Sequence, residues 1–167
     1  EVNIVYADIN LGRYYDQISF SGYGGATRSI YVNHQNLSSV LRSGYSVAYT
    51  NVLFPFPQIS YYLYNPWLVS SLVLPDNRLY TFQYNNYGEL ARVTLPTGGA
   101  YEYDYWSGNE PDTYHHASGA IGPSGFPVGI PYHVYRRLQQ RREYPPGGTG
   151  NSYSNRIDYG RVSSSTG

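Results

Sequence analysis

The chain contains no cysteine, methionine or lysine, and all eleven of its cationic side chains are arginine. Without cysteine it has no disulfide bond, no cysteine-ligated zinc site and no thiol catalysis. Eleven aspartate and glutamate residues balance the arginines to a formal net charge of zero, and a protein without a positive field binds nucleic acid poorly. No apolar run approaches the ~20 residues of a membrane-spanning helix. We therefore expect neither a nucleic-acid partner nor a membrane span, whereas secretion stays open, because exported bacterial proteins often lack cysteine.

Motifs of enzyme active sites are also scarce. The chain has no Gly-x-Ser-x-Gly nucleophile elbow, and residues 122–125 are better explained as a turn. Glu102 and Asp104 would lie on one face of a strand about 7 Å apart, a separation that suits the carboxylate pair of an inverting glycosidase. Asp104 also occupies a position in a repeat described below, which favours a structural role for the pair. We predict a non-enzymatic protein with no catalytic residue and no cofactor.

Three histidines are candidates for a metal site. His115 and His116 are adjacent, so on an extended chain their side chains point in opposite directions and cannot easily bind one ion together with His133. No second pair of ligands stands at a diagnostic spacing. We therefore predict that the chain has no metal site.

Arginines form one dense group of charge near the C-terminal end. On a strand, Arg136 and Arg142 would share one face, and Arg137 and Arg141 would share the other. The group would then be divided between two faces, which weakens it as a site for phosphate or for an acidic glycan or protein. We expect a solvated strand whose arginines stack on tyrosine or pair with acidic side chains.

Tyrosine is abundant, with 22 of the 167 residues. It favours strands, because its ring packs on a pleated surface while its hydroxyl stays wet. The chain also has 18 glycines and 11 prolines, which separate short apolar runs. This composition predicts an all-β protein with many turns.

A repeat is the strongest feature of the sequence. Pro75 is followed by a turn and three alternating aromatic residues, and the same pattern recurs twenty-one positions later after Pro96. A fixed period marks an architecture in which one hairpin-sized unit stacks on the next and cannot bury its apolar face alone. We expect a weaker third unit at residues 134–159. The residues that define the repeat are Pro75, Tyr80, Phe82, Tyr84, Gly88, Leu90, Pro96, Gly98, Tyr101, Tyr103 and Asp104.

The repeat carries a resemblance to a known family. Residues 75–98 contain the pattern Pro-Asp-Asn-Arg-x-Tyr-x-Phe-x-Tyr-Asn-x-Tyr-Gly-Glu-Leu-x-x-Val-x-x-Pro-x-Gly, which resembles the tyrosine–aspartate repeat of the Rhs family. The match covers residues 66–106, and residues 19–53 are similar to segments of large Rhs-like bacterial polypeptides. The resemblance implies a spiralling strip of sheet that forms a hollow shell. The family includes shells around bacterial toxins, components of insecticidal toxin complexes and the cell-surface teneurins.

We predict a single all-β domain or fragment, built as an antiparallel meander of hairpin repeats, with one short helix and a long irregular loop. The helix is expected to be capped by Asn36, to place Leu37, Val40 and Leu41 on one face and to end at Gly44. The predicted parts are N-terminal hairpins plus this helix at 1–65, the clear meander at 66–106, the loop at 107–131 and a further hairpin at 132–162. The predicted strands are 3–9, 13–20, 27–33, 68–74, 79–84, 89–95, 100–106, 132–144 and 152–159, with an extended connection at 51–66.

Three functions fit these features. The leading hypothesis is a non-enzymatic structural segment of a secreted or cell-surface bacterial protein of Rhs type, whose partners are further repeats of the same polypeptide. Both ends of the chain, at Glu1 and at residues 163–167, look cut, so we expect a fragment, a processed product or one ordered piece, which also agrees with the second hypothesis. The second hypothesis is a filament subunit that pairs with copies of itself through open strand edges. The third is a carbohydrate-binding adhesion module in which Trp67, Trp106 and Tyr105 stack on sugars.

Overall fold

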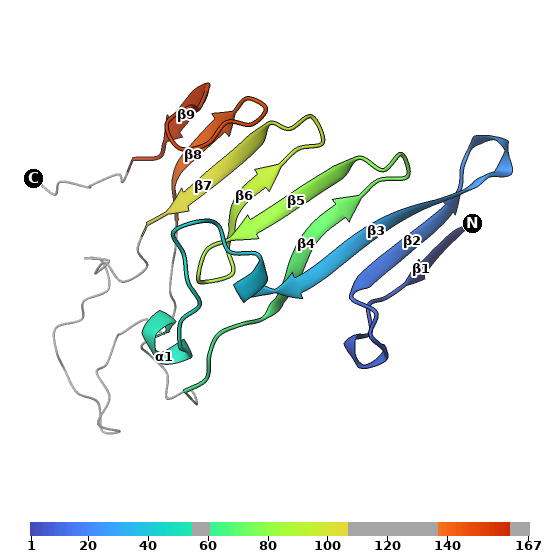
Figure 1. Cartoon of the computed structure of the whole chain (residues 1–167), viewed down its shortest axis with the longest axis horizontal. Coiled ribbons are helices and arrows are strands. Elements are labelled where there is room, and N and C mark those ends of the chain that lie inside the picture. Colours follow the sequence, from blue (N-terminus) through green and yellow to red (C-terminus); the bar gives the residue numbers. More distant parts are fainter. Residues whose placement is uncertain (55–60, 107–136, 161–167) are drawn as a thin grey trace, which may run out of the picture.

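Nine strands form one antiparallel sheet in which the order in space equals the order along the chain (Figure 1). The computed structural model describes residues 1–54, 61–106 and 137–160. Each strand pairs with the strand before it and the strand after it, so the all-β meander predicted from the sequence is confirmed. No helix in these residues is long and apolar enough to cross a membrane. The strands are β1 (Val2–Val5), β2 (Tyr15–Ser21), β3 (Thr27–Asn36), β4 (Trp67–Val73), β5 (Leu79–Tyr84), β6 (Leu90–Thr94), β7 (Ala100–Tyr105), β8 (Leu138–Tyr144) and β9 (Asn155–Asp158).

The turns of the meander repeat as the sequence predicts. Asn77, Gly98 and Gly147 each stand two positions after a proline and have positive φ angles of 62°, 84° and 75°. This left-handed conformation suits glycine and is tolerated by asparagine, which explains the residue types at these positions. A third positive-φ residue follows Pro145, but the connection from β8 to β9 is longer and is bonded differently. There the Gly147 N–H donates to the Gly98 carbonyl at 3.3 Å and the Gly148 N–H donates to the Pro145 carbonyl at 2.9 Å.

The strand ends repeat as well. The Tyr84 hydroxyl donates a hydrogen bond of 2.7 Å to the carbonyl of Val69, and the Tyr105 hydroxyl donates one of 3.0 Å to the carbonyl of Leu90. Both bonds span fifteen residues, and the second lies twenty-one positions after the first. The last tyrosine of each aromatic triplet therefore ties its strand to the strand immediately before it.

A β-bulge accompanies each of these tyrosines. The register shifts between Gln83 and Tyr84 and again, one period later, between Asp104 and Tyr105. Tyr84 consequently lies opposite Leu90 instead of Ala91. A bulge sets two residues of one strand against one of its partner, so Tyr84 and Leu90 lie opposite each other although strict alternation would pair Tyr84 with Ala91.

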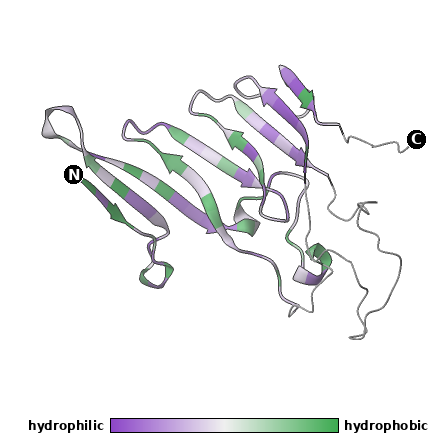
Figure 2. Ribbon diagram, turned by 180° about the vertical axis from the view of Figure 1, so that it is seen from behind, coloured by the Kyte–Doolittle hydropathy of each residue, from purple (hydrophilic) through white to green (hydrophobic). Residues whose placement is uncertain are grey.

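One face of the sheet carries an apolar row. Ile4, Ile18 and Ile30 lie opposite one another across β1, β2 and β3, and residues opposite each other in a sheet share a face. On the same face, the row continues from strand to strand across the sheet as far as β7. Its further members are Val32, Leu72, Tyr80, Phe82, Val93 and Tyr101. None of the nine side chains is buried. Figure 2 shows the apolar residues recurring along β1 to β6, whereas β8 is largely hydrophilic.

The helix predicted between Asn36 and Gly44 is absent. A 3-10 turn at Leu37–Ser39 replaces it. The backbone then pairs with the end of β5, where the Tyr84 N–H donates to the Val40 carbonyl and the Arg42 N–H donates to the Tyr84 carbonyl, both at 2.9 Å. These long-range bonds use the backbone groups that a continuing helix would need, so tertiary pairing overrides the local helical pattern.

The short α-helix lies later in the chain than predicted. Helix α1 spans Thr50–Leu53 and overlaps the start of the connection at 51–66 that we expected to be extended. Strand β1 ends at Val5 instead of residue 9, because the Asp8 side chain accepts a hydrogen bond from the Asn10 N–H and starts a 3-10 turn at Ile9–Leu11. Strand β3 continues to Asn36, three residues beyond its predicted end. The loop expected at 107–131, and residues 132–136 of the next predicted strand, lie outside the described residues.

The segment that joins β3 to β4 supplies much of the small core. We call residues 37–54 the connecting segment. Leu37, Thr50 and Leu53 within it have side chains that are 0–1 % exposed. The other buried side chains are Val40, Asn85, Ala91, Ala100, Glu102 and Tyr144. The core therefore lies where this segment meets the sheet.

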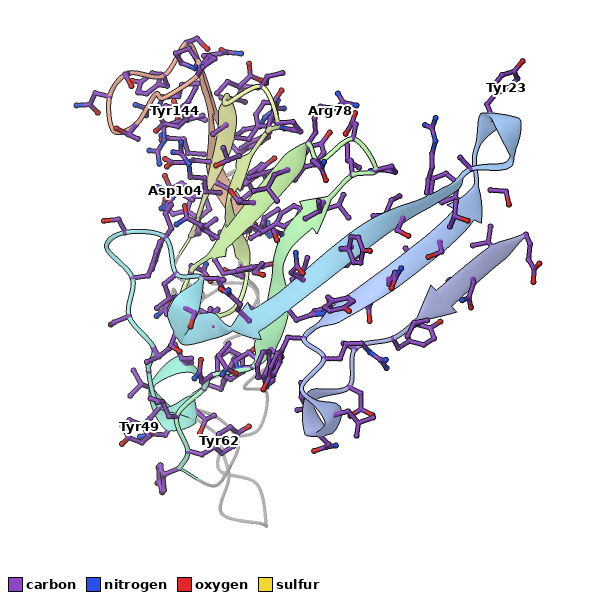
Figure 3. The ribbon with its side chains drawn as sticks, turned by 45° about the vertical axis from the view of Figure 1, so that its right-hand side comes forward. Tyr23, Tyr49, Tyr62, Arg78, Asp104 and Tyr144 are labelled. Carbon is purple, nitrogen blue, oxygen red and sulfur yellow. The ribbon has the colours of Figure 1, made fainter. Side chains whose placement is uncertain are left out.

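Many tyrosines point away from this core. Tyr23, at the tip of the β2–β3 hairpin, is 99 % exposed, and Tyr49 and Tyr62, beside α1, are more than half exposed (Figure 3). The abundance of tyrosine thus reflects exposed positions as well as packing within the sheet.

We predict that Leu37→Ala lowers the free energy of unfolding by about 2–5 kcal/mol, because it leaves a cavity beneath the connecting segment. Val52→Ala, in the same segment but 61 % exposed, is the matched control and should change stability by less than about 0.5 kcal/mol. Urea unfolding followed by circular dichroism measures both. Equal effects would show that the connecting segment does not pack as described.

Candidate functional site

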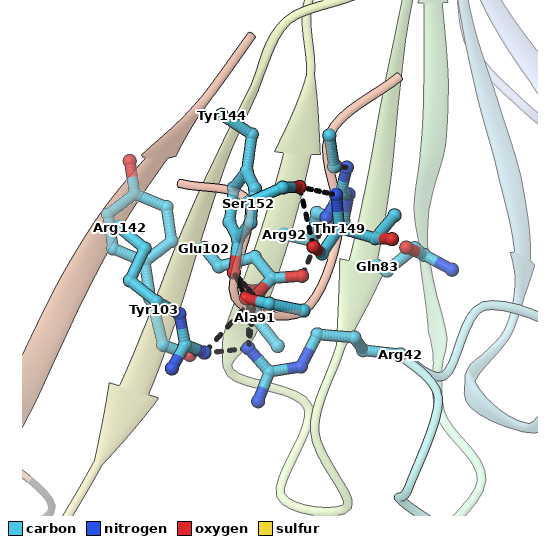
Figure 4. A network of polar contacts seen from close by, with 12 residues as sticks. Arg42, Gln83, Ala91, Arg92, Glu102, Tyr103, Arg142, Tyr144, Thr149 and Ser152 are labelled. Atoms are coloured by element: carbon cyan, nitrogen blue, oxygen red, sulfur yellow. Dashed lines mark hydrogen bonds and ion pairs between the residues drawn. The ribbon is translucent and has the colours of Figure 1, made fainter. Parts of the chain in front are cut away.

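A carboxylate held by three arginines lies on the face of the sheet opposite the apolar row (Figure 4). Glu102, in β7, accepts hydrogen bonds from Arg92 Nη1 at 2.6 Å, from Arg142 Nη2 at 3.1 Å and from the Tyr144 hydroxyl at 2.8 Å. Arg42 Nη1 stands 3.8 Å from the same carboxylate. The Glu102 side chain is only 11 % exposed, so these contacts replace most of its water.

The sheet register explains why two of the arginines are there. Arg92 lies opposite Glu102 in the β6–β7 pair, and Glu102 lies opposite Arg142 in the β7–β8 pair. Opposite charges on neighbouring strands attract when they face each other across the ladder. The third arginine, Arg42, belongs to the connecting segment and precedes Glu102 by sixty residues in the sequence. No local spacing in the sequence therefore predicts that Arg42 lies beside Glu102.

Asp104 extends the site along β7. It lies two residues after Glu102 and pairs with Arg42 and, at 2.6 Å, with Arg142. We call Arg42, Arg92, Glu102, Asp104, Arg142 and Tyr144 the Glu102 cluster. Its three guanidinium groups face two carboxylates, which leaves one positive charge in a partly buried place.

The cluster fixes two distant segments to the sheet. Arg42 Nη1 donates to the Ala91 carbonyl at 3.2 Å, which holds the connecting segment against β6. Arg92 Nη2 donates to the Gly148 carbonyl at 3.0 Å. The Gly150 carbonyl lies 2.9 Å from the Tyr144 hydroxyl, whose single proton it shares with Glu102. The same charges that pair within the sheet therefore also anchor the turn between β8 and β9.

Electrostatics at Glu102 favour the charged carboxylate. Burial raises the pKa of this carboxyl, but hydrogen bonds from Arg92 and Tyr144 and the charges of Arg42 and Arg92 together lower its pKa below the ordinary value. For Tyr144, burial and the hydrogen bond to Glu102 raise the pKa of the phenol. A glycosidase acid needs a raised carboxyl pKa to donate its proton. The electrostatics of Glu102 therefore favour an ion-pair role over the role of a general acid.

The arginines of the C-terminal group divide between faces, as predicted for Arg141 and Arg142. Arg142 belongs to the Glu102 cluster, whereas Arg141 lies over the Tyr101 ring at 4.8 Å and pairs with Glu143. Arg136 and the histidines at 115, 116 and 133 lie outside the described residues. The prediction that the histidines hold no metal is therefore untested.

The three aromatic residues predicted to stack on sugars do not form one platform. Trp67 begins β4, whereas Tyr105 ends β7 and Trp106 follows it. Three strand spacings separate them, which is about 14 Å. The Tyr105 hydroxyl donates a hydrogen bond to the Leu90 carbonyl. The backbone N–H of Trp106 donates one to the Arg137 carbonyl.

Trp67 instead stacks on a residue that the sequence analysis missed. Its ring lies 5.3 Å from that of Tyr14, at an angle of 13°, and the two residues are 41 % and 47 % exposed. Tyr14 precedes β2 and is separated from β4 by the whole of β3. Only the strand order reveals that these rings meet. Sugar binding by Trp67 stays a prediction.

Comparison with protein-family models, with curated proteins and with solved structures gives no match. The geometry of the site is therefore the basis for assigning its role. That geometry is an ion-pair cluster that holds a sheet together, with two carboxylates that are both engaged by arginine.

We predict that Glu102→Gln lowers the free energy of unfolding by about 3–5 kcal/mol at pH 7, because three arginines lose a buried partner. The folded-state pKa of Glu102 lies below its ordinary value of 4.5. The charged carboxylate therefore stabilises the fold above pH 4.5, and this contribution is lost as the pH falls through the folded-state pKa.

The measurement is urea unfolding of the wild type and of Glu102→Gln between pH 7 and pH 3. The difference between the two proteins should be large at pH 7 and should shrink below pH 4.5. Glu143→Gln, which breaks the more exposed pair with Arg141 on the other face, is the control and should cost less than about 1 kcal/mol. A difference that does not depend on pH would contradict the assigned charge state.

Proposed function

We propose that this chain is a non-enzymatic structural segment of a secreted or cell-surface bacterial protein of Rhs type, in which it forms one strip of a β-sheet shell or scaffold. The observation that carries the proposal is the sheet order. In the part of the chain that the structure describes, nine strands follow one another in sequence, and each pairs within the sheet with its neighbours in the chain. An architecture of this kind lengthens by adding units without rearranging those already present.

The repeated details support a strip that curves. The turn after Pro75 recurs after Pro96, and the tyrosine bond of Tyr84 recurs at Tyr105. A bulge accompanies each tyrosine, and bulges bend the strand that contains them and increase its twist. Bends at equivalent positions of successive units add in one direction, which is what the wall of a closed shell requires.

The two faces of the strip also suit a wall. The Glu102 cluster makes one face polar and fixes its geometry with ion pairs, while the other face carries the half-exposed apolar row. A sheet with one apolar and one polar face is stable only if the apolar face meets another surface or encloses a space. The hollow, shell-like arrangement is what the Rhs resemblance of residues 66–106 implies. The sheet by itself supports a wall but does not indicate a closed shell.

The test is electron microscopy of the purified natural polypeptide that contains this segment. We expect hollow or curved particles whose walls are one sheet thick, with strands spaced by about 4.8 Å. A variant in which Arg42, Arg92 and Arg142 are replaced by glutamine should lose regular walls, because the connecting segment is released from the sheet. Matched replacement of Arg28, Arg78 and Arg156 should leave them intact. A compact domain with a second layer packed over the apolar row would contradict the proposal.

A further inference from the structure

The stacked rings of Tyr14 and Trp67 lie at the margin of the sheet, beyond the end of the apolar row. Tyr14 precedes β2 and Trp67 begins β4, so the two rings meet across the end of β3. This end of β3 and the start of β4 lie next to the connecting segment (Figure 1). Each ring covers one face of the other, yet both residues are more than 40 % exposed. An aromatic surface of both rings therefore stays open to water.

Backbone hydrogen bonds hold both rings in place. The Leu37 N–H donates to the carbonyl of Pro66, the residue before Trp67, at 2.9 Å, and the Leu37 side chain is fully buried. On the other side, the His34 N–H donates to the Tyr14 carbonyl at 2.8 Å. A site that is already ordered loses less entropy when a ligand binds. The stack therefore has the rigidity that a binding platform needs.

A free amide stands beside the stack. Asn36 lies opposite Trp67 in the β3–β4 pair, so the two side chains share a face. Asparagine before a helical turn usually caps it, but the Asn36 side chain makes no capping bond. Asn65 caps the turn instead, since its Oδ1 accepts a hydrogen bond from the Ser38 N–H at 2.8 Å. Within the described part of the chain, the Asn36 amide has no hydrogen-bond partner, so its donor and its acceptor are both available to a ligand.

The geometry of the stack selects among the ligands that aromatic sites bind. A centroid distance of 5.3 Å at 13° is an offset stack with the rings in contact, so no ligand group enters between them. This differs from the aromatic-lined groove that accepts a proline-rich segment and from the cage of rings that encloses an ammonium group. One open ring face suits the C–H groups on the flat side of a pyranose sugar, which meet the negative face of the ring. The sugar hydroxyls then lie around the ring, where an uncharged amide can both donate to them and accept from them.

We infer that Trp67, Tyr14 and Asn36 bind one neutral pyranose unit of a glycan. The sugar stacks on the outer face of Trp67 and forms hydrogen bonds with the Asn36 amide, while Tyr14 supports the indole from its other side. Tyr105 and Trp106, which were predicted to stack on sugars together with Trp67, take no part. The site lies at the strand ends, so it stays accessible at the margin of a wall whose apolar row is covered. It goes beyond the proposed structural role and does not depend on the Rhs resemblance.

The test is a fluorescence titration of the 167-residue chain carrying Trp106→Phe, in which Trp67 is the only tryptophan. The probes are oligosaccharides of glucose, N-acetylglucosamine, galactose and mannose. We expect at least one of them to change the Trp67 emission and to saturate in the micromolar to millimolar range. Absence of a change with all four at up to about 10 mM would overturn the inference. A response to a proline-rich peptide and to none of the sugars would also overturn it.

Asn36→Ala in the same background separates binding from folding. It should weaken sugar binding at least about fivefold, the effect of one lost hydrogen bond, and should leave the urea midpoint unchanged, because Asn36 caps nothing. Gln35→Ala is the matched control: Gln35 is exposed and adjacent in β3, but its side chain points to the opposite face, so it should change neither quantity. Equal sugar affinity of Asn36→Ala and Gln35→Ala would contradict the assigned site. Either failure would leave the proposed wall-forming role standing, since that role is tested by the shape of the natural polypeptide.

Discussion

Backbone hydrogen bonding between neighbouring strands is the constraint on which this structure depends. The described residues form a single sheet in chain order, so each strand pairs with its chain neighbours, and the connecting segment adds distant bonds at Tyr84 and Ala91. Each hairpin must therefore be stable through its turn, its bulge and its two neighbours. The positive-φ residue of the turns after Pro75 and Pro96 and the tyrosine-to-carbonyl bond recur for this reason, because these two units face the same problem and solve it with the same residues.

The ion pairs of the Glu102 cluster stabilise the sheet where a second packed layer of secondary structure would otherwise do so. Its arginines bind the connecting segment, three strands of the sheet and the turn after β8 to one buried carboxylate. Ion pairs of this kind are specific in direction and costly to break, since removing one member leaves a charge without its partner. They fix the position of the connecting segment on one face, while the opposite face keeps its apolar row available for contact. This difference between a polar face fixed by ion pairs and an exposed apolar face is the physical basis of the proposed wall.

The parts of this fold that could be predicted from the sequence are those that depend on residues close together in the chain. The period between Pro75 and Pro96 and the alternating aromatic residues predicted the meander, because turns and strand patterns depend on residues close in the chain. It failed where a distant backbone decides the outcome. The residues after Leu37 have a helical pattern, yet their N–H and C=O groups pair with Tyr84. The bulges moved Tyr84 opposite Leu90, and neither Arg42 beside Glu102 nor Tyr14 beside Trp67 has a signal in sequence spacing.

Native-state hydrogen exchange of backbone amides is the measurement that tests most directly whether the molecule is a strip of neighbour-dependent strands. We expect graded protection, highest in β6, β7 and β8 around the Glu102 cluster and falling strand by strand toward β1 and β9, because a one-dimensional array opens from its ends. Uniform protection of all nine strands, lost in one global step, would contradict it, since that result requires a shared core that couples the edges to the centre.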